Sequence, residues 1–151
     1  MKRYIISFIV LFLFTSCKCE GTFQTIAGLN NLSNHTILVS HYRNGVVQPT
    51  IFLLDVNGSK EIGRTHGRSK GTIWPSPFLI SDSVVVVFDN AKKVIHYGKT
   101  EGTSKNSITL LSPRSLFKEA NYKKKTIIDD RCYLETEFVY TFTEQDYLNI
   151  K

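Results

Sequence analysis

Apolar and polar residues follow one another in short alternating or continuous runs over most of this chain, which is the pattern of β-strands. The clearest case is 132–142, where large apolar residues recur on one face and glutamates on the other. In the predicted strand 50–56, residues 51–54 are apolar at consecutive positions, which predicts that both faces are covered, and 84–88 is a second fully apolar strand. Stretches rich in β-formers predict further strands at 36–42, 93–97, 107–111 and 126–128.

Turn signals separate these strands. Asn-Gly pairs at 44–45 and 57–58 predict tight hairpin turns, because Asn and Gly adopt the left-handed backbone that such turns need. The pair at 57–58 is the strongest of these signals, and it predicts that 59–63 folds back onto 50–56. A turn is predicted at 89–92 as well.

Helix signals are few. Ser112 followed by Pro113 predicts the start of a short helix over 114–121. Thr143 with Asp146 three residues later predicts the cap of a terminal helical turn. The sequence therefore predicts an all-β domain of antiparallel strands and hairpins with one or two short helices, in the form of a sandwich, a barrel or a partial propeller-like sheet.

The first residues have the anatomy of an export signal. Lys2 and Arg3 precede an apolar run over 4–14, and small residues then lead to Cys17. A membrane-spanning helix needs about 20 apolar residues, and this run is well short of that length. The segment 1–16 is therefore predicted to be a signal peptide.

Ser16 directly before Cys17 resembles the cleavage site of a bacterial lipoprotein signal, although Phe14 stands where that family usually has leucine. The resemblance implies that Cys17 becomes the mature N-terminus and carries lipid, which anchors the protein in the bacterial cell envelope. The expected place is the outer membrane, on either its periplasmic or its surface face. The alternative is an ordinary cleaved signal in which the cysteine is incidental.

The signal sets the expected domain boundaries. Residues 17–34 contain few large apolar side chains and several Gly and Asn, so they are predicted to be a linker from the lipid anchor. Alternatively, Phe23, Ile26 and Leu29 dock on the domain. Residues 35–151 are predicted to form a single β-rich domain.

The net charge limits the classes of partner to expect, and the cysteines limit the possible disulfides. The formal net charge of +6 includes Lys2 and Arg3, so the processed chain is mildly basic. This charge favours acidic partners such as an anionic glycan, a lipid headgroup or an acidic protein, and an exported location argues against nucleic acid. Cys19 and Cys132 remain when Cys17 is lipidated, and either they form a disulfide or Cys132 is a small buried residue. The histidines show no metal-ligand spacing with the cysteines, so no metal is expected.

The most distinctive stretch is 63–71, a basic run with three glycines. Its basic residues recur with period two, so an extended chain would point them all the same way: Arg64, His66, Arg68 and Lys70. Such a stripe either binds a phosphate or carboxylate through arginine forks or is a solvated basic loop. Trp74, directly before Pro75, either stacks on a ligand or partner or covers one end of the core.

Residues 51–58, followed by Ile62-Gly63-Arg64, resemble a blade of the six-bladed β-propeller lipoproteins, and 77–98 resembles the next blade. The resemblance covers about a third of the chain. A closed propeller has about 4 to 8 blades, whereas this chain has room for about three. It implies either a truncated relative or a different β fold with similar hairpins, and no site residues are transferred.

No catalytic constellation or cofactor motif stands out, so no catalytic residue and no cofactor are predicted. The sequence favours a membrane-anchored, non-enzymatic binding module for an anionic or protein ligand at the cell envelope. One alternative is an inhibitor or immunity-type lipoprotein that blocks a toxic or lytic enzyme. The other is a small hydrolase, which would need His66 or His96 beside a carboxylate or serine.

Overall fold

The computed structural model describes residues 21–68, 71–102 and 105–151. The predicted signal peptide, Cys17, Cys19 and Lys70 lie outside these residues. The elements are β1 (Thr22–Leu32), β2 (Ile37–Arg43), β3 (Val46–Leu54), β4 (Ser59–Arg68), η1 (Pro77–Ile80), β5 (Ser83–Phe88), β6 (Lys92–Tyr97), β7 (Ser107–Ile108), η2 (Glu119–Asn121), β8 (Lys123–Asp129), β9 (Tyr133–Thr143) and α2 (Glu144–Leu148).

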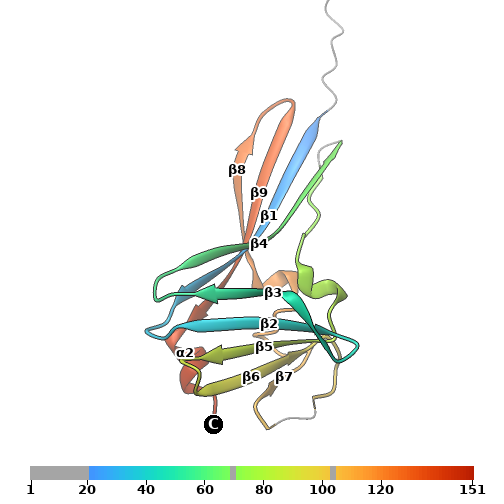
Figure 1. Cartoon of the computed structure of the whole chain (residues 1–151). Helices are drawn as coiled ribbons and strands as arrows, with labels where there is room; N and C mark the ends of the chain where they lie inside the picture. Colours follow the sequence, from blue (N-terminus) through green and yellow to red (C-terminus); the bar gives the residue numbers. More distant parts are fainter. Residues whose placement is uncertain (1–20, 69–70, 103–104) are drawn as a thin grey trace, which may run out of the picture.

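These strands form two sheets, which confirms the all-β prediction (Figure 1). Sheet A has the order β4-β1-β9-β8, and sheet B has the order β3-β2-β5-β6-β7. Most strand pairs are antiparallel, as predicted, while β1 pairs with β9 and β6 with β7 in parallel. Both parallel pairs join strands far apart in sequence or separated by a long loop, whereas the short turns give antiparallel neighbours.

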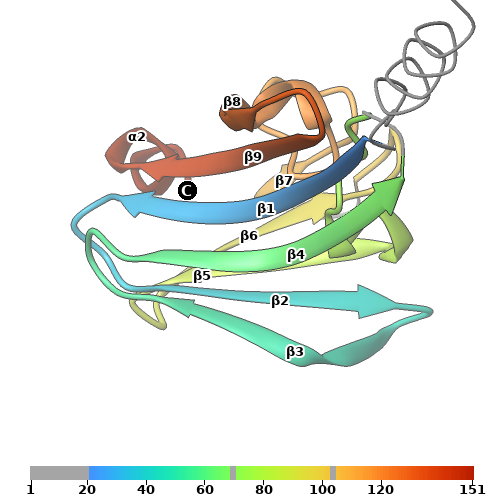
Figure 2. The ribbon, with the colours of Figure 1, turned by 90° about the horizontal axis from the view of Figure 1, so that it is seen from above.

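The predicted linker is wrong from Thr22 onward. Thr22–Leu32 is β1, which lies between β4 and β9 along its length (Figure 2). Phe23 and Leu29 are buried, as the docking alternative predicts, and Ile26 is half-buried on the other face. The domain therefore includes β1 and does not begin at residue 35.

Two of the three predicted turns form the expected hairpins. Asn44 and Gly45 have φ of 52° and 76° and join β2 to β3, while Asp89 and Asn90 have φ of 49° and 56° and join β5 to β6. Asn57 also has a positive φ of 58°, but the chain crosses there from sheet B to sheet A. β4 then pairs with β1, so the predicted hairpin of 59–63 on 50–56 is wrong.

One of the two helix predictions is confirmed and the other is wrong. Over 114–121 only Glu119–Asn121 is helical, as a short 3₁₀ turn, so the helix predicted there is wrong. The terminal turn is confirmed as α2, where the Asp146 carboxylate accepts hydrogen bonds from the backbone N–H and the hydroxyl of Thr143 at 2.8 and 3.0 Å.

The core lies between the sheets, whose strands cross at a steep angle in Figure 1. It is rich in aromatic side chains, including Phe88, Phe138, Tyr140 and Phe142, each at most 1% exposed. The outer face of sheet B is apolar as well: Ile51 and Leu53 on the edge strand β3 are 52% and 60% exposed. The expectation that 50–56 is covered on both faces is therefore wrong for the described chain.

Candidate ligand-binding cavity

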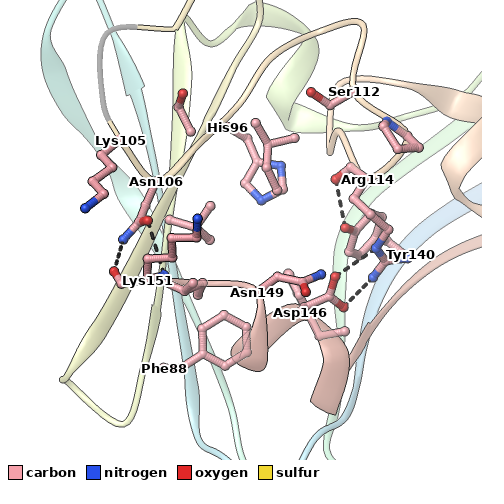
Figure 3. Close-up of a pocket in the computed structure, with 16 residues that line it drawn as sticks. Phe88, His96, Lys105, Asn106, Ser112, Arg114, Tyr140, Asp146, Asn149 and Lys151 are labelled. Atoms are coloured by element: carbon pink, nitrogen blue, oxygen red, sulfur yellow. Dashed lines mark hydrogen bonds and ion pairs between the residues drawn. The ribbon is translucent and has the colours of Figure 1, made fainter.

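A cavity of about 360 Å³ opens between the sheets at the end of the domain that holds α2 (Figure 3). Its walls come from β5, β6, β7 and β9, from 112–114, and from α2 with 149–151. The apolar side chains that line it are Phe88, Val94, Ile108, Phe142 and Ile150. This volume is within the range of small-molecule sites, and the wall is apolar with a few polar groups, as in such sites.

His96 is the most informative of the polar groups. The alternation of β6 points His96 inward with Val94, and the imidazole is 1% exposed. Its Nδ1 accepts a hydrogen bond from the backbone N–H of Leu116 at 3.2 Å. Burial lowers the pKa of His96 to about 3, so the ring is neutral at ordinary pH. Since Nδ1 is the acceptor, the proton is assigned to Nε2.

The Nε2–H of His96 is a donor aimed into the cavity. Figure 3 shows one ring nitrogen of His96 pointing toward the centre of the cavity. Within the described chain, no group accepts a hydrogen bond from this nitrogen. This nitrogen is not among the buried side-chain atoms that lack a partner in the described residues, so it is accessible from the cavity and can donate to an acceptor oxygen of a ligand.

An ion pair closes one wall of the cavity. Nε and Nη2 of Arg114 donate to the two carboxylate oxygens of Asp146 at 2.8 and 2.5 Å, and Nη2 also donates to the Thr141 carbonyl at 2.7 Å. The guanidinium carbon lies 4.7 Å from the ring centroid of Tyr140, whose hydroxyl donates to the Arg114 carbonyl at 2.9 Å. The fork of Arg114 is therefore already occupied, and the pair carries no net charge.

The opposite wall holds further donors. Asn106 fixes the backbone of Lys151 by donating to its carbonyl at 2.6 Å and accepting from its N–H at 3.3 Å. The Lys151 ammonium reaches toward the cavity (Figure 3). The amide oxygen of Asn149 accepts from Gln145 at 2.8 Å, which leaves the amide nitrogen of this exposed lining residue as a donor. The polar groups of the cavity thus offer mainly donors.

The predicted basic stripe is only partly brought together. Arg64, His66 and Arg68 lie exposed on the outer face of β4, and Lys70 is not among the described residues. Arg64 donates to the Glu61 carboxylate at 2.9 and 2.6 Å, an interaction that raises its pKa.

Acidic residues share the face of this stripe. Across Gln24 of β1, His66 is in register with Glu135 of β9, and across Ile26 Arg64 is in register with Glu137. The surface is therefore of mixed charge, which sequence periodicity within one strand does not reveal.

Trp74 is not an exposed stacking group. Its side chain is 8% exposed and packs edge-to-face on Tyr122, with ring centroids 4.9 Å apart. This corrects the prediction that Trp74 contacts a ligand or partner and favours the alternative in which it covers the core. Sequence alone could not decide this, because neighbouring prolines occur in both exposed loops and segments packed on a sheet.

Two other histidines have polar partners. His35 lies between Asp89 and Glu144, with Nδ1 2.5 Å and Nε2 3.2 Å from their carboxylates. His41 Nδ1 lies 2.8 Å from the Ser81 hydroxyl, and both side chains are buried. The hydrolase hypothesis concerns His66 and His96, and within the described residues neither has a carboxylate or serine hydrogen bond.

Cys132 is disulfide-bonded, so it does not titrate. Its pairing with Cys19 stays a prediction, because Cys19 is not among the described residues. Across the described ranges, no group of three or more His, Cys, Asp or Glu side chains is placed to hold a metal ion. Within the same residues, no helix is long and apolar enough to cross a membrane.

Sequence reasoning did not single out the cavity. The period of 93–97 places Val94 and His96 on one face, which is the signal that could have marked an inward-facing histidine. Arg114, Asp146 and Lys151 meet His96 only through the topology of the two sheets.

Comparisons with known proteins add little to this geometry. No family model and no curated protein matches the chain. One solved structure, described as the NMR structure of the protein from Eubacterium rectale, aligns with 80% of this chain and 89% of its own, at 10% identity and a TM-score of 0.23. A TM-score this low carries no argument about the function.

Proposed function

We propose that this chain is an exported lipoprotein, anchored in the bacterial cell envelope through lipid on Cys17, that acts as a non-enzymatic binding module for a small anionic ligand. The observation that carries the binding role is the unpaired N–H of His96, directed into a largely apolar cavity. A neutral imidazole with a pKa of about 3 donates a hydrogen bond but is a poor proton acceptor at ordinary pH, which favours binding over acid–base catalysis.

Binding is tested by the thermal stability of the full chain in lipid nanodiscs. Ligands that bind the native state raise Tm, so small anions, neutral compounds and amines are compared. Ile108→Phe puts a larger side chain at the cavity wall and so fills part of the cavity. Ile127→Phe is the matched control, at an exposed position of β8. We expect anions to raise the Tm of the natural chain and of Ile127→Phe, but not of Ile108→Phe. Equal shifts in all three proteins, or none, would refute a binding role for the cavity.

Anchoring is tested separately from binding. Labelled palmitate should be incorporated into the natural chain in bacterial cells and should be absent from Cys17→Ser. The lipid on Cys17 would hold the protein at the outer membrane, because each buried methylene contributes about 0.8 kcal/mol to membrane binding. Equal labelling of the two proteins would show that Cys17 is not the lipidated residue.

A second candidate function is that of an inhibitor or immunity-type lipoprotein with a protein ligand. It is favoured by the apolar outer face of sheet B, where Ile51 and Leu53 of β3 are exposed beside half-buried Leu38, Val85 and Val87. Large exposed apolar patches commonly mark protein interfaces. A photo-crosslinking residue at position 53 should then capture one specific enzyme in cells, whereas the same residue at position 127 on β8 should not.

The basic stripe is a further surface for acidic partners. Arg64→Ala together with Arg68→Ala should weaken binding to vesicles with anionic headgroups, and the loss should be largest at low salt. The same affinity and salt dependence in natural and variant proteins would remove the stripe from the proposal.

A further inference from the structure

Three side-chain hydrogen-bond donors line one end of the cavity. The His96 Nε2–H is directed into it, and the exposed side chains of Asn149 and Lys151 line it. The Asp146 carboxylate, which is the acidic group among the lining residues, is paired on both oxygens with Arg114. A ligand that fits must therefore supply acceptor atoms at this end.

Among the side chains that line the cavity, the unpaired charge is positive and small. Arg114 and Asp146 neutralise each other, and the remaining charged lining residues are Lys105 and Lys151. Figure 3 shows the Lys151 side chain extended toward His96 and the Lys105 ammonium directed away from the cavity. One ammonium beside neutral N–H donors matches a single negative charge spread over two oxygens.

A phosphate dianion fits this arrangement less well. Phosphate sites in proteins commonly use arginine forks or several convergent backbone N–H groups. Here the Arg114 fork is bound to Asp146 and to the Thr141 carbonyl. The polar end of the cavity therefore favours a carboxylate.

The rest of the cavity selects the body of the ligand. Phe88 and Phe142 pack edge-to-face at 6.2 Å between ring centroids, and Val94, Ile108 and Ile150 complete an apolar wall. A volume of about 360 Å³ is near the lower end of small-molecule sites. The wall therefore suits a short alkyl or aryl group rather than a sugar or a peptide.

We infer that the cavity binds a small monocarboxylate with an apolar body, whose carboxylate lies between His96 and Lys151 and whose apolar part contacts Phe88, Phe142 and Ile150. This inference rests on the proposed binding function and names the chemical class of the ligand. The Lys151 ammonium supplies the positive charge that pairs with the carboxylate, and the hydrogen bond from His96 Nε2–H fixes the orientation of the carboxylate. The Arg114–Asp146 pair holds the wall beside them.

The test uses three probes that share one apolar body: 4-phenylbutyrate, 4-phenylbutan-1-ol and 4-phenylbutylamine. Their affinities for the full chain in lipid nanodiscs are measured by titration calorimetry, with empty nanodiscs as the blank. A charge-assisted hydrogen bond is about twice as strong as a neutral one. We therefore expect the carboxylate to bind about tenfold or more tightly than the alcohol, and the amine to bind most weakly.

Matched variants locate the head group. Lys151→Gln removes the charge that faces the cavity, and Lys93→Gln removes an exposed charge on the outer face of sheet B. We expect Lys151→Gln to weaken 4-phenylbutyrate about tenfold and to leave the alcohol unchanged, while Lys93→Gln affects neither. Unchanged Tm without ligand shows that Lys151→Gln remains folded.

Nitrogen NMR of histidine-labelled protein reports the second contact. The carboxylate should shift the Nε2 resonance of His96 and leave the protonation state of the ring neutral between pH 5 and 8. Equal affinity of the three probes, the tightest binding of the amine, or an unshifted His96 signal would overturn the inference while leaving a binding role for the cavity intact. If none of the three probes binds, the carboxylate class is overturned, and the wider panel of compounds decides the binding role.

Discussion

Asn31 connects the two sheets at the corner where the chain passes between them. It is fully buried near the end of β1. Its Nδ2 donates to the carbonyls of His35 and Asp55 at 2.7 and 2.9 Å. Its Oδ1 accepts from the N–H and the hydroxyl of Ser33 at 3.0 and 2.7 Å. One side chain thus links the loop after β1 to the end of β3. We predict that Asn31→Ala is strongly destabilising.

The magnitude follows from these four hydrogen bonds. Each contributes about 0.5–1.5 kcal/mol net, and removing one partner leaves buried groups unpaired. We therefore expect Asn31→Ala to lower the free energy of unfolding by about 3 kcal/mol. Asn31→Asp should cost at least as much at neutral pH, because it places a carboxylate oxygen against two carbonyl oxygens. Asn30→Ala is the matched control, since Asn30 is half-buried on the opposite face of β1, and it should cost under about 1 kcal/mol.

Urea unfolding followed by fluorescence measures these differences. The chain has a single tryptophan, Trp74, which is buried and therefore reports the loss of native packing. Midpoints and slopes give the free energy of unfolding for each variant. If Asn31→Ala and Asn30→Ala were equally stable, the corner would be held by other contacts and the reasoning would be refuted.

Three further predictions concern other parts of the fold. The pKa of His35 lies above its usual 6.5, chiefly because of its hydrogen bond to the Asp89 carboxylate. The stabilisation by protonated His35 should therefore be complete below pH 6.5 and lost as pH rises through the folded-state pKa. In melts at a series of pH values, His35→Gln should abolish this decline in stability. The buried Thr25 hydroxyl has no hydrogen-bond partner in the described protein, so Thr25→Val should raise the free energy of unfolding by about 1 kcal/mol. Thr22→Val on the exposed face should change this free energy little, and a lower value for Thr25→Val would contradict the prediction. A Cβ at Gly63 would overlap the Pro75 carbonyl oxygen, so Gly63→Ala should lower the free energy of unfolding by about 1–3 kcal/mol in urea unfolding, and an unchanged free energy would show that the contact relaxes freely.

Strands with clear periodicity could be predicted from the sequence, and β1 could not. β9 alternates large apolar residues with polar ones, and β5 is a run of valines ending in Phe88. β1 instead places Thr25 and Ala27 on its buried face, so its pattern resembles that of a linker.

Local signals fixed turns but not the partners of strands. Asn57 adopts the left-handed backbone that its Asn-Gly pair predicts, yet the strand that follows pairs with β1 in the other sheet. The partner is set by burial of whole sheet faces, which a turn does not encode. The cavity was hidden for the same reason, because Arg114 and Asp146 approach His96 from distant parts of the chain.

The position of Thr22 at the start of β1 also determines how the domain would stand on a membrane. If Cys17 carries the proposed lipid, only residues 18–21 separate it from β1, and a chain of that length spans at most roughly 17 Å. In Figure 1 the start of β1 lies at the opposite end of the domain from α2 and the cavity. The end of sheet A near Thr22, Arg68 and Tyr133 would then rest close to the lipid surface. The mouth of the cavity would face the aqueous side, so a ligand would reach it from solution without first entering the bilayer.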